Sequence, residues 1–217
     1  MKKIILFVLF STSIIMNISC QEDNFLVYFP LLEHDSVFNT IDGQKLYYES
    51  LQKKSLPDFI VLNYIFNNNK DEIYGIEEGY NVDTDEYFTT KYVKKVYPIF
   101  KKIIGNKYLL CYGLESIIYL CIYDLETNKI TNREIISDFS DEMGNIIVHS
   151  IIFSNNYILK AKIEESVNFE LIKICLQDSE FKITKQITID NFTQNIHEIF
   201  EKSFPILEIS SKGEPLK

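Results

Sequence analysis

The chain has 217 residues, enough for one domain with an apolar core, and its 31 acidic and 22 basic residues give a net charge of −9. An acidic surface repels phosphate backbones, so the charge argues against nucleic-acid binding. Only 7 glycines and 5 prolines are present beside 14 tyrosines and 16 phenylalanines, a bias that favours β-strands.

Residues 1–19 have the layout of a secretory signal peptide. Two lysines precede an apolar stretch at residues 4–16, which is too short to span a bilayer because a spanning helix needs about 20 residues. The small residue Ser19 then stands directly before Cys20. Ordinary secretory cleavage, with the cysteine as a bystander, is the alternative interpretation.

This layout resembles the lipoprotein signal of Bacteroidota-type bacteria, although Asn17 stands where that signal usually has an aliphatic residue. The resemblance implies that Cys20 is acylated and becomes the first mature residue. It also implies that the acidic segment 21–24 directs export to the cell surface. We therefore expect a lipid-anchored protein of the outer membrane, exposed at the surface, whose contact with the membrane is the lipid on Cys20.

The expected domain division follows from this signal. Residues 1–19 are the signal peptide, 20–30 a tether and 31–217 a single domain, because no linker or low-complexity tract divides the remainder. Within residues 33–38, the tripeptide Asp35-Ser36-Val37 resembles the short acceptor for O-linked glycans in the same bacteria, which makes Ser36 a candidate glycosylation site.

Helical patterns are confined to three short segments, at residues 45–53, 55–66 and 190–202. The second begins with Ser55 as a capping residue and has Pro57 near its first turn. The third places Ile199 and Phe200 at helical spacing from Ile196.

Strand patterns fill the C-terminal half, separated by turns rich in Asn, Asp and Ser. The expected strands are residues 107–112, 117–124, 129–137, 146–153, 157–163, 168–176 and 181–189. Strands so close in sequence pair most simply as an antiparallel meander. The predicted fold class is mainly β, a meander closed as a sandwich, a half-barrel or a propeller-like array, with one to three short helices.

A weak internal sequence repeat bears on the choice among a sandwich, a half-barrel and a propeller-like array. Residues 106–110 resemble 155–159, and Lys-Ile-Thr recurs at 129–131 and 182–184. Spacings of about 40 to 50 residues are typical of propeller blades, and residues 122–129 resemble the outer hairpin of a blade. In so biased a composition, chance recurrence explains the same similarity.

The cysteines are expected to be reduced. Once the lipidated cysteine is set aside, Cys111, Cys121 and Cys175 form an odd number. A hairpin turn centred on residues 114–115 places Cys111 opposite Ile118, so the two nearest thiols do not face each other. We expect all three to be small apolar core residues, with one disulfide as the alternative.

Residue patterns typical of catalytic or metal sites are weak. His34, His149 and His197 lie far apart, and neighbouring strand residues point to opposite faces, so His149 cannot pair directly with Ser150. We expect His149 to be a hydrogen-bonded core residue. Residues 83–86 begin like a calcium loop but lack its glycine, and the three carboxylates within residues 138–145 fit a hairpin loop better than a cation site. Glycine motifs that bind phosphate are also missing, so neither a metal nor a cofactor is predicted.

One tyrosine-rich stretch could serve as a binding platform or as half-buried packing. It contributes Tyr80, Tyr87, Tyr92 and Tyr97. Glu77 and Glu78 could line a sugar site there, but adjacent carboxylates on a strand diverge, so we expect a solvated face.

The sequence therefore favours a non-catalytic binding or assembly module over an enzyme, with an envelope protein or a glycan as partner. One alternative is an envelope hydrolase of glycans or peptides that uses Glu77, Asp141 or Glu142. The other is a lipoprotein that neutralises a toxin by occupying a basic site.

Overall fold

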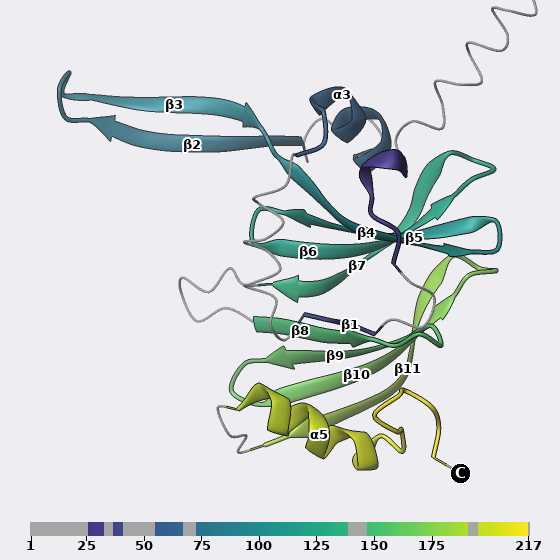
Figure 1. Ribbon diagram of the computed structural model, residues 1–217. Helices are drawn as coiled ribbons and strands as arrows, with labels where there is room; N and C mark the ends of the chain where they lie inside the picture. Colours follow the sequence, from purple (N-terminus) through teal and green to yellow (C-terminus); the bar gives the residue numbers. More distant parts are fainter. Residues whose placement is uncertain are drawn as a thin grey trace, which may run out of the picture.

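The computed structural model describes residues 26–32, 37–40, 55–66, 73–138, 147–190 and 195–216 (Figure 1). Over these ranges the chain is mainly β, with short helical segments, which confirms the predicted fold class. In chain order the elements are η1 (Leu26–Tyr28), β1 (Phe38–Asn39), α3 (Asp58–Ile60), η2 (Val61–Ile65), β2 (Tyr74–Asn81), β3 (Glu86–Val93), β4 (Val96–Ile104), β5 (Lys107–Leu114), β6 (Ile117–Asp124), β7 (Lys129–Asp138), β8 (Ile147–Ile152), β9 (Tyr157–Ile163), β10 (Val167–Cys175), β11 (Glu180–Ile189) and α5 (Ile196–Ile206).

The main sheet is an antiparallel meander in the order β11-β10-β9-β8-β7-β6-β5-β4. Its centre is narrow, because the described residues of β7 and β8 pair only at Asp138 and Val148. Strand β1 adds to β8 through the pair Phe38 and Ile152. The sheet therefore consists of two four-stranded halves, which we call the first half (β4–β7) and the second half (β8–β11).

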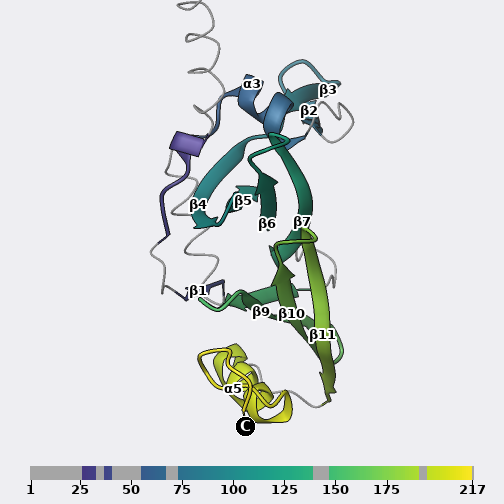
Figure 2. The same ribbon diagram turned by 90° about the vertical axis from the view of Figure 1, so that its right-hand side faces the viewer.

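The two halves pack against each other through a shared apolar cluster. Figure 2 shows the first half above the second half. Residues of β5 and β6 alternate between this cluster and a second one on the opposite face, where η1, α3 and η2 cover the first half. Helix α5 covers the outer face of the second half. Burial on both faces explains why β5 and β6 are almost continuously apolar in sequence. The shared cluster comprises Phe38, Ile99, Phe100, Leu109, Cys111, Ile118, Leu120, Ile122, Ile136, Ile152, Ile158, Ile172 and Ile174.

The seven predicted strands are confirmed within two residues at each end, and those at 117–124 and 157–163 coincide with β6 and β9. Strands β2, β3 and β4 were not predicted. Most of β2 and nearly all of β3 is exposed, so their apolar residues have no one-sided alternation to reveal them. In β4, Pro98 and a register shift between Pro98 and Phe100 interrupt the pattern.

The predicted helices are confirmed with changed boundaries. The helix expected at 55–66 is α3 followed by a π-helical turn, η2, and its cap is Pro57 without a side-chain bond, so the capping role given to Ser55 is wrong. The helix expected at 190–202 starts later, because the Asn195 side chain accepts hydrogen bonds from His197 N and Glu198 N. The helix expected at 45–53 lies outside the described residues.

Part of the expected tether belongs to the fold. Leu26 and Phe29 are buried in the cluster beneath η1. Pro30 O accepts from Lys101 N at 2.7 Å, and Leu32 N donates to Lys101 O at 2.8 Å, so this segment covers the edge of β4. The packed part of the chain therefore begins by Leu26, inside the 20–30 range expected to be tether.

Corresponding strands and turns of the two halves are separated by a constant number of residues. The similarities found in the sequence matched this repeat only in part. Strand β11 lies 51 residues after β7 at both of its ends. The left-handed turn residues Gly105 and Asn156 show the same spacing, as do Asn128 and Ser179. Each half is a four-stranded meander like a propeller blade, but both belong to one hydrogen-bonded sheet rather than to separate blades.

The three cysteines in the described part of the chain are free, as expected, although the predicted register is wrong. The turn is centred one residue later, so Cys111 pairs with Leu120 and Cys121 with Leu110. Cys111 and Cys121 are buried on opposite faces of the sheet, which keeps their thiols apart. Cys175 is half-buried rather than a core residue.

Candidate functional site

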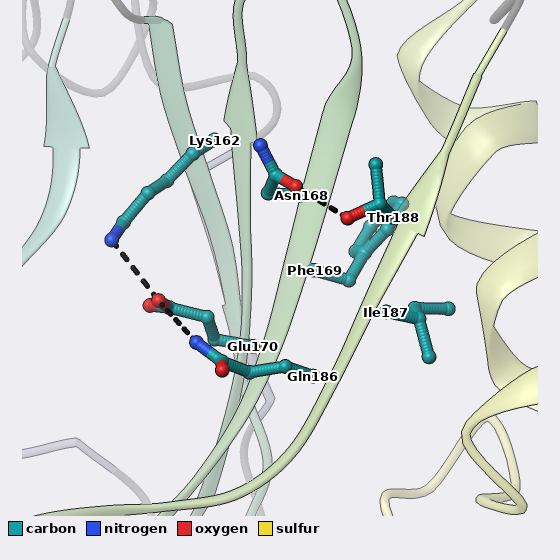
Figure 3. A pocket seen from close by; sticks show the side chains of 7 residues that line it. All are labelled: Lys162, Asn168, Phe169, Glu170, Gln186, Ile187 and Thr188. Carbon is teal, nitrogen blue, oxygen red and sulfur yellow. Dashed lines mark hydrogen bonds and ion pairs between the residues drawn. The ribbon is translucent and has the colours of Figure 1, made fainter.

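A polar hollow of about 240 Å³ opens on the second half (Figure 3). Lys162 and Gln186 point toward Glu170 from the two neighbouring strands, and Thr188 donates to Asn168 Oδ1 at 2.7 Å. The full lining is Lys162, Asn168, Phe169, Glu170, Gln186, Ile187 and Thr188.

Glu170 is the centre of a buried ion-pair network. Its Oε1 is 3.0 Å from Lys162 Nζ and accepts from Gln186 Nε2 at 3.1 Å. Its Oε2 is 3.1 Å from Lys160 Nζ, and the side chains of both partners are only 8% exposed. Lys160 also pairs with Glu134 of β7. The network therefore links the two halves of the sheet.

The Glu170 carboxyl is held ionised. Burial by itself raises its pKa, but the hydrogen bond from Lys162 and the charge of Lys160 outweigh burial, so the pKa lies below its ordinary value. Both oxygens already accept from donors of the protein. A carboxylate in this state is poorly suited to take up a proton in a reaction near neutral pH, and it suits a structural role.

Sequence reasoning missed this network, although a signal was present. Lys160 and Lys162 interrupt an apolar strand at period two, and Glu170 follows on the next strand. Lys160 is paired with Glu170 and Lys162 with Asn168 in the hairpin register. Pairing the two predicted strands about the turn at 164–166 would have placed these charges on one face.

The second feature is a two-stranded ribbon, β2 and β3, which projects from the body (Figures 1 and 2). Every residue from Tyr80 to Tyr92 is exposed. Large apolar side chains stand in solvent there, with Ile76, Val82 and Tyr87 exposed to 66%, 82% and 88%. The Tyr87 ring also lies 4.9 Å from the exposed ring of Tyr80, centre to centre, and exposed apolar side chains that gather on one element mark interaction surfaces.

The register gives the ribbon two chemically different faces. One face, which we call face A, carries the pairs Tyr74–Val93, Ile76–Lys91, Glu78–Thr89 and Tyr80–Tyr87. The opposite face, face B, carries Gly75–Tyr92, Glu77–Thr90, Gly79–Phe88 and Asn81–Glu86. Exposed aromatic rings are present on both.

Internal contacts stiffen the ribbon. On face B the rings of Tyr92 and Phe88 lie directly over Gly75 and Gly79, so closely that a Cβ at Gly79 would be 2.4 Å from Phe88 Cζ. On face A, Lys91 Nζ lies 4.1 Å from the centre of the Tyr74 ring.

The base of the ribbon is fastened to the body through Glu115 of the β5–β6 turn. Tyr92 Oη donates to Glu115 Oε1 at 3.2 Å, and Lys94 Nζ lies 3.3 Å from Glu115 Oε2. The negative charge of Glu115 raises the pKa of Tyr92, so the phenol keeps the proton that it donates.

The tip of the ribbon is acidic. It turns at residues 82–85, where Asp85 has a φ of 56° and accepts a hydrogen bond from Tyr80 Oη. Between residues 74 and 93 the sequence holds five carboxylates and a single lysine, Lys91.

The predicted site residues do not come together in the described part of the chain. Glu77 is exposed on face B, and its neighbour Glu78 points to face A, which confirms the diverging pair and the solvated face. Cys20, Ser36, Asp141 and Glu142 lie outside the described residues, as does His34.

His149 is hydrogen-bonded, as predicted, and half-buried. Its Nδ1 lies 3.2 Å from Thr40 O, and burial lowers its pKa. Ser150 points to the other face, where the Thr40 hydroxyl accepts from Ser150 N at 2.7 Å and donates to Ile136 O at 3.1 Å. Thr40 thus bridges β7 and β8 at the seam between the halves.

Comparison with protein-family models, curated proteins and solved structures finds no match to this chain. Within the described residues, no group of three or more His, Cys, Asp or Glu side chains is arranged to hold a metal ion. None of the described helices is long and apolar enough to cross a membrane.

Proposed function

We propose that this protein is a lipid-anchored component of the bacterial cell envelope that acts as a non-catalytic binding or assembly module. The lipid on Cys20 supplies attachment to the outer membrane, and the β2–β3 ribbon supplies the binding surface. The observation that carries the proposal is the projecting ribbon with Ile76, Val82 and Tyr87 in solvent.

The contrast with the polar hollow supports binding over catalysis. The carboxylate of the hollow, Glu170, already accepts hydrogen bonds at both oxygens, whereas the ribbon offers apolar and charged groups that the body does not cover. A second form of the same proposal is a lipoprotein that neutralises a toxin by occupying a basic site of that toxin. The acidic tip of the ribbon favours this form.

The anchor is tested by palmitate labelling of wild-type cells and of cells carrying Cys20→Ala. We expect label on the wild type and none on the variant, and an unlabelled wild type would contradict the anchor.

The binding surface is tested by pull-down of the anchored protein from intact envelopes. We expect the double variant Ile76→Ser/Tyr87→Ser to lose a partner that wild type captures. The matched control Ile183→Ser/Ile206→Ser removes exposed apolar side chains from the body and is expected to keep it. Equal capture by both double variants would rule out the ribbon as the binding surface.

A further inference from the structure

The ribbon carries exposed apolar groups on both of its faces, and this restricts the shape of a partner. Ile76, Tyr80 and Tyr87 stand on face A, and Phe88 and Tyr92 on face B. A flat partner surface could cover only one of the two faces. A partner with a cleft would cover both, and strands of eight residues project by about 26 Å, enough to enter one.

The charge of the ribbon restricts the partner further. Its outer part carries Glu77, Glu78, Asp83, Asp85 and Glu86, and its single lysine, Lys91, lies at the inner end against Tyr74. The whole chain has a net charge of −9, so a second copy would be repelled. A cleft lined with lysine or arginine complements this surface, and such complementarity increases both association rate and specificity.

The ribbon is also held in its shape by contacts within the chain itself. Two-stranded ribbons are only marginally stable by themselves, yet here rings lie over both glycines, and Glu115 fastens Tyr92 at the base. Ordering in advance lowers the entropy cost of binding. A stiff, acidic, aromatic projection of this kind suits insertion as a preformed element.

From these three features we infer that the β2–β3 ribbon inserts into a basic cleft of a partner protein, which contacts face A and face B at once. The inference rests on the proposed binding function and adds the chemistry and the shape of the partner.

Thr89 and Thr90 provide the test of shape. They are exposed neighbours on β3 that point to face A and face B respectively. A photo-crosslinking residue, p-benzoylphenylalanine, is placed at position 89 or at position 90 of the full-length anchored protein in intact cells. We expect both positions to yield adducts with the same protein. Adducts from one position only would overturn insertion, as would adducts with a glycan or with a second copy of this chain.

The test of charge uses a neutralised ribbon, Glu77→Gln/Glu78→Gln/Asp83→Asn/Glu86→Gln, which leaves the Asp85 bond to Tyr80 in place. The matched control makes the same charge change on exposed residues of the body, Glu164→Gln/Glu165→Gln/Asp178→Asn/Glu180→Gln. We expect adduct yield to fall at least about tenfold in the neutralised ribbon and to stay at the wild-type level in the control.

The outcomes separate the two proposals. A ribbon-dependent partner whose yield is unchanged by neutralisation would overturn the basic cleft and leave the binding function standing. Absence of any adduct at both positions would overturn both. Circular dichroism of each purified variant establishes that the fold is retained. The crosslinking variants at positions 89 and 90 keep every charge of the ribbon, so they test the shape of the partner separately from its charge.

Discussion

At the scale of single residues, the Glu170 network shows how charge is kept inside this fold. The carboxylate accepts from Lys160, Lys162 and Gln186, and Lys160 is shared with Glu134 across the seam. A buried charge is tolerated only while its partners are present, because taking it out of water costs several kcal/mol. Each member therefore depends on the others.

Replacing Glu170 with Gln is expected to lower the free energy of unfolding by about 2 kcal/mol at pH 7. The change leaves the buried Lys160 with Glu134 as its remaining carboxylate. Urea denaturation measures the loss, and the exposed Glu164→Gln is the control, expected to change stability by less than about 0.5 kcal/mol. Equal stability of the Glu170 variant and wild type would contradict a structural network.

The same network predicts an acid dependence. The pKa of Glu170 is depressed in the folded state, so its stabilisation is fully present above the unfolded value of about 4.3 and is lost as pH falls through the folded pKa. Stability of wild type should therefore decline on acidification below about pH 4 more steeply than that of Glu170→Gln. Parallel urea midpoints for the two proteins from pH 5 to pH 2.5 would argue against the depressed pKa.

His149 gives a second pH dependence in a different range. Burial lowers its pKa, so the unfolded chain binds a proton below about pH 6.5 that the folded chain takes up only at lower pH. Stability should decline as pH falls from about 7.5 to 5.5, and His149→Gln should remove that part of the decline. Histidine NMR titration gives the direct measurement, and a midpoint of 6.5 or above for His149 would refute it.

At the level of secondary-structure elements, the ribbon and the main sheet are stabilised by different interactions. Strands β5 and β6 are held by burial on both faces, whereas β2 and β3 are held by cross-strand pairs and by rings lying over glycine. A change within the ribbon should therefore stay local. The turn at Glu115 is the exception, because it fastens the base of the ribbon to the body.

Gly79→Val is expected to disorder the ribbon without destabilising the body. The added Cβ falls 2.4 Å from Phe88 Cζ, so the ring must leave its place. Amide hydrogen exchange of β2 and β3 should become faster, while the free energy of global unfolding changes by less than about 0.5 kcal/mol. Thr90→Val, a substitution of similar shape on the same face, is the control and should leave exchange unchanged. Slow exchange in Gly79→Val would show that the ring contact is dispensable.

At the level of the entire fold, we expect the two halves to unfold as one cooperative unit. They meet through few backbone pairs at β7 and β8, but they share the cluster that runs from Ile99 to Ile174. The Thr40 hydroxyl adds a polar bridge across the seam. We therefore expect that the repeated 51-residue spacing does not divide the chain into independent folding units.

Thr40→Val tests this cooperativity. The substitution keeps the shape and removes the acceptor of Ser150 N, so unfolding should become easier by about 2 kcal/mol. Far-ultraviolet circular dichroism and tyrosine fluorescence should still report one coincident urea transition. Two separate transitions would mean that the halves unfold independently. Thr188→Val, which alters an exposed hydrogen bond, is the control with an expected change below about 0.5 kcal/mol.

Strands β5 to β11 of the main sheet could be predicted from the sequence alone, because strands such as Ile117–Asp124 are runs of apolar residues bounded by turn residues. The sequence also determined their antiparallel order, since short turns allow little else. The lipoprotein interpretation of residues 1–20 rests on the sequence alone and stays a prediction. The separation of Glu77 from Glu78 followed from strand alternation and required no tertiary contact.

The meeting of the two halves, the direction of the ribbon and the burial of particular charges depend on tertiary contacts. The Lys160, Glu134 and Glu170 network joins residues from β7, β9 and β10, and Thr40 reaches Ser150 from more than a hundred residues away. Local patterns cannot encode such contacts, because they depend on which faces become buried together. The ribbon was hidden for the same reason, since its apolar residues face solvent on both sides and therefore leave no periodic signal.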